Sequence, residues 1–177
     1  MRRYVTCQNR EGKSGVRTDT APPKVSEYRA IPGMQTSILW ATDSDTRLPS
    51  SERDPVLALP SLHPAPGASV FMTLTLPPDS IMTSPDFDPV AAAAEQARLA
   101  PGLAERFEPN APGFHTTDTV DYVVVLEGHI WLETDTGEVR LGPHDCVVQN
   151  GTRHAWRNRA NVPATIAVVL LGVRREP

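Results

Sequence analysis

The sequence has few cysteines and no long apolar run. Cys7 and Cys146 are the only two cysteines in 177 residues, and they form no CxxC pair. Disulfide frameworks and thiolate zinc sites need several well-spaced cysteines, so the sequence argues against both and favours a reducing compartment. The N-terminus lacks the apolar segment of a secretory signal, and no run of about 18 apolar residues could span a bilayer. We therefore expect a cytoplasmic protein with no membrane partner.

An excess of basic residues is also missing. The formal net charge is -4, and basic residues gather only in short pieces such as RHAWRNR. Because nucleic-acid binding depends on a basic stripe or patch, we expect no nucleic-acid partner. Hydrophobic residues make up 40% of the chain, which is enough at this length for one core. A single domain with additional arms is the natural expectation.

The chain divides into two regions of different composition. Residues 1–67 are rich in Pro, Ser, Asp and Arg and hold only short strand-like runs. We expect them to be N-terminal arms that pack on a barrel or on a partner subunit, with the barrel itself formed by residues 68–177. A helical insertion is predicted at about 88–107, with Asp88 as its N-cap and Pro89 at its first position. Pro101-Gly102 should break this helix.

Short strand-like segments separated by turn residues follow the predicted helix. They are TVDYVVVLEG, HIWLETD, EVRLG, DCVVQN, HAWRN and ATIAVVLLGV. No internal repeat and no alternation of strands with helices is present. Short antiparallel strands at this spacing indicate an all-β fold, either a small sandwich or a barrel.

The segment GFHTTDTVDYVVVLEG changes in character along its length. Side chains alternate across a strand, so one face would carry His115, Thr117, Thr119, Asp121, Val123 and Val125. This face begins polar and becomes apolar, as expected for a barrel interior whose mouth is a binding site. The opposite face, which includes Tyr122, is also apolar and needs a cover. We therefore predict a homodimer, stabilised by strand exchange through residues 1–40.

Two motifs in this region resemble those of the cupins. In the first cupin motif, His115 matches the first histidine, Asp121 occupies the glutamate position, and Gly128 is the closing glycine. In the second, GPHDCVVQNGTRHAWRN provides Gly151, His154 and Asn158 at matching positions. The chain also resembles small bacterial cupins with the phrases HTTDTVDY and VVQNGTRHAWRN. The resemblance implies a cupin double-stranded β-helix, or jelly-roll barrel, with N-terminal strand arms and one inserted helix.

The same resemblance implies a candidate metal site. Full cupin ligand sets bind Fe, Mn, Ni or Zn, and the matching positions here leave His115, Asp121 and His154 as a 2-His-1-carboxylate set. This chain departs from the motif at Thr117, which replaces the second histidine, and at Gln149, which replaces a proline. The alternative is that His115 and Asp121 form a buried hydrogen-bonded pair while His154 is a polar rim residue. Both interpretations remain open at this point.

These residues lead to a prediction of function. We expect an enzyme that acts on a small organic ligand of an aromatic, polyketide-like or keto-acid type. His115, Asp121 and His154 would supply either metal-assisted chemistry, such as that of a dioxygenase, or acid-base chemistry for an isomerase, dehydratase or cyclase. The expected substrate-binding residues are Thr117, Thr119, Val123, Trp156 and Asn158. The alternative function is a non-catalytic small-molecule binding module or sensor.

Overall fold

The computed structural model describes residues 1–49 and 53–176, and within them the fold is almost entirely β. Its only α-helix in these ranges is α1 (Pro89–Leu99), and short 3-10 turns occur at η1 (Pro55–Ala58), η2 (Asp79–Ile81) and η3 (Ala104–Arg106). The strands are β1 (Arg3–Gln8), β2 (Ser14–Thr20), β3 (Lys24–Glu27), β4 (Gln35–Thr42), β5 (Ser69–Leu76), β6 (Thr119–Glu127), β7 (Ile130–Thr134), β8 (Gly137–Leu141), β9 (Cys146–Gln149), β10 (His154–Arg157) and β11 (Ala164–Gly172).

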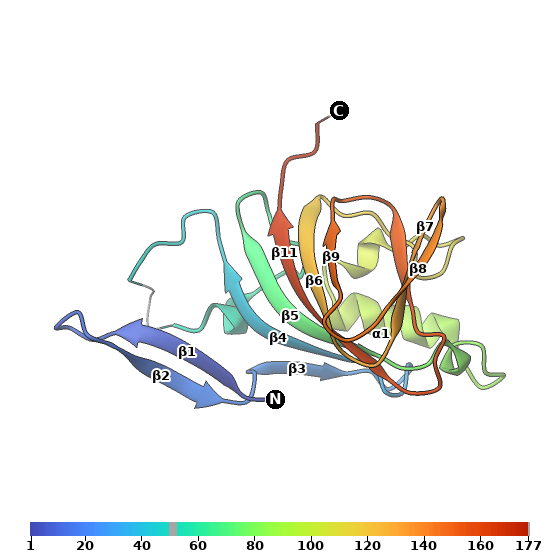
Figure 1. Ribbon diagram of the computed structural model, residues 1–177, viewed down its shortest axis with the longest axis horizontal. Coiled ribbons are helices and arrows are strands. Elements are labelled where there is room, and N and C mark those ends of the chain that lie inside the picture. The colour runs from blue at the N-terminus through green and yellow to red at the C-terminus, as the bar shows by residue number, and fades with distance from the viewer. Residues whose placement is uncertain (50–52, 177) are drawn as a thin grey trace.

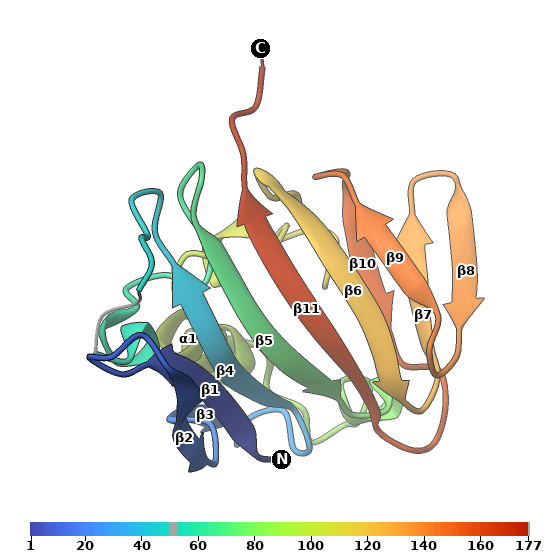
Figure 2. The ribbon, with the colours of Figure 1, turned by 60° about the vertical axis from the view of Figure 1, so that its left-hand side comes forward.

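Two antiparallel sheets form the body of the protein. One has the strand order β3-β4-β5-β11-β6-β9, and the other has the order β10-β7-β8 (Figure 2). A single core takes side chains from both sheets, including Val70 and Ile166 from the first and Ile130 from the second. The predicted all-β jelly-roll architecture is confirmed, because two antiparallel sheets close on one shared interior.

The N-terminal region contributes more to the body than the sequence predicts. Strand β4 pairs with β5 over most of its length, and β3 pairs with β4 at the edge of the same sheet. Ile38 and Ala41 of β4 lie in the main core, so this strand is a part of the barrel wall. The division at residue 67 therefore needs correction. The separate arm consists of the β1–β2 hairpin alone, which extends away from the body (Figure 1).

Helix α1 begins as its sequence predicts, but it ends at Leu99, before Pro101-Gly102, and the predicted extent to about residue 107 is too long because only the short turn η3 follows. The Asp88 side chain accepts hydrogen bonds from the backbone amides of Val90 and Ala91 at 2.9 and 3.0 Å, which satisfies donors that the first helical turn leaves free. The helix packs through Ala92 against Tyr28 and Ile31 in a second, smaller apolar cluster. It thereby covers the turn that joins β3 to β4.

The alternation predicted along β6 and the residues before it is confirmed. His115, Thr117, Thr119, Asp121, Val123 and Val125 are all buried and line the interior. Tyr122 and Leu126 on the other face are 51% and 46% exposed. The strand thus separates a polar-to-apolar inner wall from an apolar outer face.

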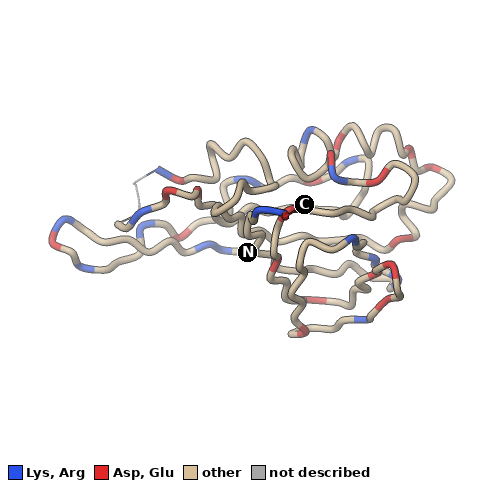
Figure 3. The backbone as a smooth tube through the Cα atoms, turned by 90° about the horizontal axis from the view of Figure 1, so that it is seen from above, with Lys and Arg blue, Asp and Glu red and all other residues tan. Residues whose placement is uncertain are grey.

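The structure also bears on the cysteines and on membrane and charge properties. Cys7 and Cys146 are both free thiols. No helix in the described ranges is long and apolar enough to cross a membrane. Acidic and basic residues are interspersed over the body (Figure 3), consistent with the small net charge of -4.

Candidate functional site

Two histidines meet at one end of the inner wall. The backbones of His115 and His154 form an isolated antiparallel bridge, with N–H to carbonyl distances of 2.9 and 3.0 Å. This pairing brings the two imidazole rings close together, with centroids 4.3 Å apart and ring planes tilted by 49°. Both side chains are buried, with exposed fractions of 8% for His115 and 1% for His154. Backbone pairing therefore fixes the two rings as a unit.

Each histidine is held in a defined tautomer. Nδ1 of His115 donates to the carbonyl of Gly113 at 3.0 Å, and Nδ1 of His154 donates to the carbonyl of Thr152 at 2.9 Å. Burial lowers the pKa of both imidazoles, and for His154 burial together with the neighbouring His115 lowers the pKa to about 4. Both rings are therefore neutral at neutral pH, and each keeps its Nε2 lone pair free to accept a proton or bind a ligand.

A polar row continues from the histidines along the same wall. The Thr119 hydroxyl donates to that of Thr117 at 2.8 Å, and both side chains are fully enclosed. Asp121 follows them, and its Oδ1 has no hydrogen-bond partner. Burial raises the pKa of Asp121 to about 6, although the hydroxyl of Thr119 acts in the opposite direction. A buried carboxyl with an unpaired oxygen is costly to maintain, which marks Asp121 as a functional candidate.

The donor set fits a metal site only in part. Imidazoles tied through Nδ1 to backbone carbonyls are oriented as metal ligands usually are, and the free Oδ1 of Asp121 is a suitable oxygen donor. However, among residues 1–49 and 53–176 no three His, Cys, Asp or Glu side chains form a group that could hold one metal ion. His115 and His154 come together, whereas Asp121 does not complete a three-ligand cluster with them. The predicted 2-His-1-carboxylate set therefore does not fit this geometry.

A third imidazole on the inner wall should supply a third metal ligand beside His115 and His154. Thr117 is inward and fully enclosed, so in the Thr117→His variant the new side chain would project from the same wall as His115. We expect this variant to bind Zn(II) about 10- to 100-fold more tightly than wild type in a calorimetric titration. Thr116→His is the matched control, because position 116 lies on the opposite face of the same segment. Equal affinities for the two variants would contradict the proximity of position 117 to the histidine pair.

The other predicted binding residues lie at different depths. Val123 belongs to the main core, and Trp156 packs partly buried against it, with its ring edge-on to that of His154 at 5.9 Å. Asn158 does not face a ligand. Its side-chain amide donates to the carbonyls of Leu76 and Val162, and its Oδ1 accepts from the amide of Ala160. All three contacts join backbone segments, so we correct Asn158 to a structural residue that ties loops together.

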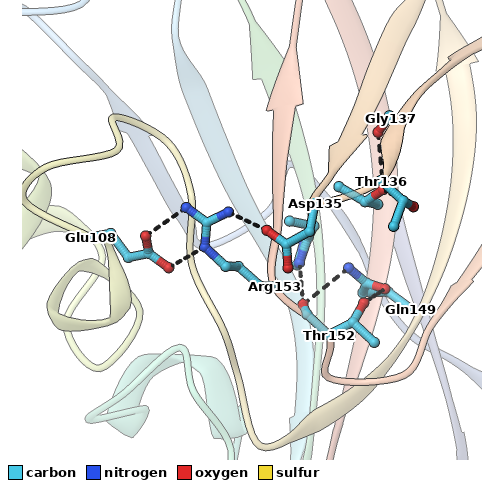
Figure 4. Close-up of polar contacts among 9 residues, drawn as sticks. Glu108, Asp135, Thr136, Gly137, Gln149, Thr152 and Arg153 are labelled. Carbon is cyan, nitrogen blue, oxygen red and sulfur yellow. Dashed lines mark hydrogen bonds and ion pairs between the residues drawn. The ribbon is translucent and has the colours of Figure 1, made fainter.

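Gln149 is a site residue that the motif comparison did not predict. It is buried and lies directly opposite Asp121 in the β6–β9 register. Its amide donates to the carbonyl of Thr152, the same oxygen that accepts from His154 Nδ1, and its Oε1 accepts from the Thr152 hydroxyl (Figure 4). Gln149 therefore orients the turn that fixes the tautomer of His154. Its position, where the motif expects proline, is the signal that could have revealed it.

Residues 107–114, here called the covering segment, precede His115 and pack against the histidine pair. The Phe107 ring is edge-on to that of His115 at 5.0 Å, and the two residues also form a backbone bridge. Arg153 holds this segment by a two-pronged ion pair to Glu108 at 2.7 and 2.8 Å, and it also binds Asp135 (Figure 4). The Arg153 guanidinium lies 3.9 Å from the centroid of the Phe114 ring. These contacts, here called the latch, hold residues 107–114 against His115.

Removal of the Arg153 side chain, and with it the ion pair to Glu108, should make the covering segment more mobile. In the Arg153→Ala variant we expect severalfold faster hydrogen exchange at the amides of Glu108 and Phe114, whose backbone bonds close the turn that Arg153 holds. Mass spectrometry of exchanged peptides measures this change. Arg159→Ala is the matched control, since it removes another arginine ion pair, to Glu138, outside the segment. Equal protection in wild type and Arg153→Ala would show that Arg153 does not hold the segment.

Two cavities open on the outside of the protein, away from the histidine pair. One, of about 950 Å³, lies between the β1–β2 hairpin and strands β4 and β5. The other, of about 600 Å³, is bordered by His63, Arg106 and the C-terminal residues Arg174 and Arg175. Neither is lined by His115, Asp121 or His154. The cavity predicted at the His115 end of the strand is thus not one of these two.

Comparison with known proteins gives short sequence matches. No family model matches the sequence. The chain is 52% identical over 48 residues to phomopsin biosynthesis cluster protein D of Diaporthe leptostromiformis, and equally so to oryzines biosynthesis cluster protein J of Aspergillus oryzae. These matches cover 27% of this chain and 25% and 27% of the two proteins. The matched part therefore spans about a quarter of the length of these curated relatives.

Solved structures similar to this chain include cupin domains. The cupin domain of an XRE family transcriptional regulator from Enterobacter cloacae aligns with a TM-score of 0.42 and 16% identity, over 80% of this chain and 99% of that one. The Schizosaccharomyces pombe Cnp3 cupin domain aligns with a TM-score of 0.47 and 10% identity, over 97% and 87% of the two chains. A sugar phosphate isomerase of the cupin superfamily from Silicibacter pomeroyi aligns at 0.41 and 19%, over 87% and 70%.

These likenesses concern the fold and carry no argument about activity. The cupin resemblance of the sequence rests on the residues at the two motifs, and His115, Asp121 and His154 of those motifs are buried in the structure. With two antiparallel sheets closed around the inner wall, the chain has the architecture of a small cupin domain.

Proposed function

We propose that this protein is an enzyme that moves protons on a small organic substrate, as an isomerase, dehydratase or cyclase does. The observation that carries the proposal is geometric: the buried imidazoles of His115 and His154 lie side by side, and Asp121 on the same inner wall has a buried Oδ1 with no hydrogen-bond partner. The pKa shifts of these groups agree with it. Burial raises the pKa of Asp121 to about 6 and lowers that of His154 to about 4. At pH 5 the carboxyl is therefore mainly protonated while the imidazole is neutral. Titratable groups displaced in this way by their surroundings are typical of acid-base catalysis.

The two groups have complementary roles in this chemistry. Neutral His154 accepts a proton at Nε2, because its Nδ1–H is already bound to the Thr152 carbonyl. Protonated Asp121 donates a proton or a hydrogen bond to an oxygen of the substrate. His115, whose ring lies 4.3 Å from that of His154, helps to keep the pKa of His154 low, so the proton that His154 accepts is readily returned. Isomerisation, dehydration and ring closure need only the removal and return of protons, so no oxidant or reductant enters this proposal.

The remaining wall supports an organic substrate of modest polarity. Val123 and Val125 follow Asp121 on the inner face, and Trp156 borders His154. An aromatic, polyketide-like or keto-acid compound would place its apolar part there and its carbonyl near the polar row. The relatives named for biosynthesis clusters support a role in the synthesis of a small metabolite, although they match only 27% of this chain.

The proposal can be tested without knowledge of the natural substrate. Phenylpyruvate and 2-oxobutyrate serve as probes, because removal of the proton next to their ketone exchanges it for deuterium in D₂O. We expect the protein to accelerate this exchange, as followed by proton NMR. His144→Asn is a suitable control variant, since His144 is exposed and its φ of 74° is one that asparagine tolerates. Saturable probe binding without any faster exchange would overturn catalysis and favour the binding module.

A further inference from the structure

We propose that a surface hollow at the end of β11, here called the arginine hollow, binds a small organic phosphate. Its volume of about 600 Å³ lies within the usual range of ligand sites. Three arginines border it, Arg106, Arg174 and Arg175, together with the carboxylate of Asp118. Because the histidine pair does not line this hollow, the inference concerns a second site and goes beyond the proposed function.

Hydrogen bonds between distant segments fix the walls of the arginine hollow. The backbone amide of Asp118 donates to Nε2 of His63 at 3.1 Å, and its carbonyl accepts from the amide of Val173 at 3.0 Å. Burial lowers the pKa of His63, and the charge of Arg106 acts in the same direction, which favours the neutral ring whose Nε2 accepts this bond. The loop at His63, the start of β6 and the C-terminal tail that leaves β11 (Figure 1) are therefore joined at one point.

Asp118 holds two of the arginines in place. Its Oδ1 accepts from Nε of Arg175 at 2.6 Å, and its Oδ2 accepts from Nη1 of Arg106 at 3.4 Å. Nη2 of Arg175 donates to the carbonyls of Thr117 and Gly151, both at 2.8 Å. The Arg175 guanidinium is thus fixed by three contacts before a ligand arrives, and a fixed side chain loses less conformational entropy on binding.

The arginines keep unused hydrogen-bond donors. A guanidinium carries five N–H groups in a planar fork that matches the oxygens of a phosphate. Arg174 is exposed, and within residues 1–49 and 53–176 no hydrogen bond or ion pair holds it. The side chains of Arg106 and Arg175 are 40% and 50% exposed despite their contacts to Asp118. All three guanidiniums are therefore accessible to an anion in the hollow.

The balance of charge favours a doubly charged ligand. Three guanidiniums and one carboxylate leave an excess of two positive charges around the hollow, although the whole chain has a net charge of -4. The hydrogen bond from Arg175 lowers the pKa of Asp118, so this carboxylate is ionised at neutral pH. A phosphate monoester carries roughly −1.5 to −2 charges at pH 7 and matches the excess, whereas a single carboxylate matches half of it.

The rest of the lining indicates an organic group on the phosphate. Pro64, Ala65, Pro66 and Val173 border the same hollow and present apolar surface. A free phosphate ion fills only a small part of about 600 Å³. A compact apolar group attached to the phosphate would cover this surface and remove it from water, which adds affinity.

Calorimetric titration of the full chain with phenyl phosphate, at fixed ionic strength and pH 7.5, tests the inference. We expect one saturable site that binds phenyl phosphate about 5-fold more tightly than inorganic phosphate, because the ring covers apolar surface. Arg174→Gln should weaken binding by about 10-fold, since it removes a charge-assisted contact that solvent partly screens. Arg106→Gln is a second variant with the same expected direction. Arg98→Gln, which changes an exposed arginine of α1, is the matched control and should bind as wild type does.

His154→Asn separates the arginine hollow from the histidine pair. This variant should bind phenyl phosphate as wild type does, whatever happens to proton exchange, so the two proposals can fail independently. Loss of binding in His154→Asn would place the phosphate at the histidine pair and overturn the inference.

Three further results would also contradict the site. They are the absence of saturable binding at about 10 mM phenyl phosphate, wild-type affinity in both Arg174→Gln and Arg106→Gln, and equal affinity for phenyl phosphate and inorganic phosphate. Sedimentation with vesicles that contain phosphatidic acid is the last arm. Binding to these vesicles without binding of phenyl phosphate would assign the arginines to a lipid headgroup and exclude the small-molecule site.

Discussion

Replacement of His154 with glutamine is expected to lower the rate of probe deuteration by about 10²- to 10⁴-fold, the usual contribution of a positioned acid or base. Glutamine has a similar length, and its amide nitrogen takes the place of Nε2. His154→Asn is the companion variant, because its amide nitrogen takes the place of Nδ1 and can still donate to the Thr152 carbonyl, which keeps the shape of the turn. Neither amide can accept a proton at neutral pH. The loss therefore reports the proton transfer itself, measured by NMR as the initial rate of exchange under saturating probe.

The dependence of this rate on pH adds an independent criterion. The neutral form of His154 predominates above pH of about 4, and the protonated form of Asp121 predominates below pH of about 6. Molecules that have neutral His154 and protonated Asp121 together are therefore most abundant near pH 5. We expect the exchange rate plotted against pH to be bell-shaped and centred there. His115→Gln should cause a similar loss, and the double variant should lose little more, because the two rings act as one unit. An unchanged rate in His154→Gln would remove this residue from the mechanism.

Local patterns in the sequence were sufficient to predict the inner wall. Side chains of a strand alternate, so the order of residues from His115 to Val125 determines which of them face the interior. The same argument placed Tyr122 outside, where the structure has it 51% exposed. The start of helix α1 could be predicted because Asp88 and Pro89 act within a single turn. Each of these features depends on neighbours close in the chain.

The features missed by the sequence depend on residues that are distant in the chain. Strand β4 belongs to the barrel because it pairs with β5, about 30 residues later, and its short apolar run does not reveal that partner. The latch joins Arg153 to Glu108, which are 45 positions apart. The incomplete metal cluster likewise depends on how far Asp121 lies from the histidine pair, and the motif spacing alone does not determine it.

The second large effect concerns stability, and it arises from the buried carboxyl of Asp121. Its pKa rises from 3.8 in the unfolded chain to about 6 in the folded protein. Below pH 3.8 both states are protonated, so burial of an ionised group costs nothing. Between pH 3.8 and about 6 the unfolded state loses its proton first and stability falls, since the folded state binds more protons. Above pH 6 the full cost remains, on the order of 3 kcal/mol for a shift of about two units.

Asp121→Asn should remove this pH-dependent cost, because asparagine does not ionise. We expect the free energy of unfolding of the variant, relative to wild type, to increase by about 2 kcal/mol between pH 4 and pH 8, since the unfolded state is already partly ionised at pH 4. Comparing the two pH values cancels any constant effect of the new amide on packing or hydrogen bonding. Urea denaturation followed by tryptophan fluorescence measures the difference. Asp86→Asn changes an exposed carboxyl and should give the same difference at both pH values. If Asp121→Asn behaves like this control, Asp121 is ionised and solvated in the folded protein, and it cannot serve as the acid of the proposed proton transfer.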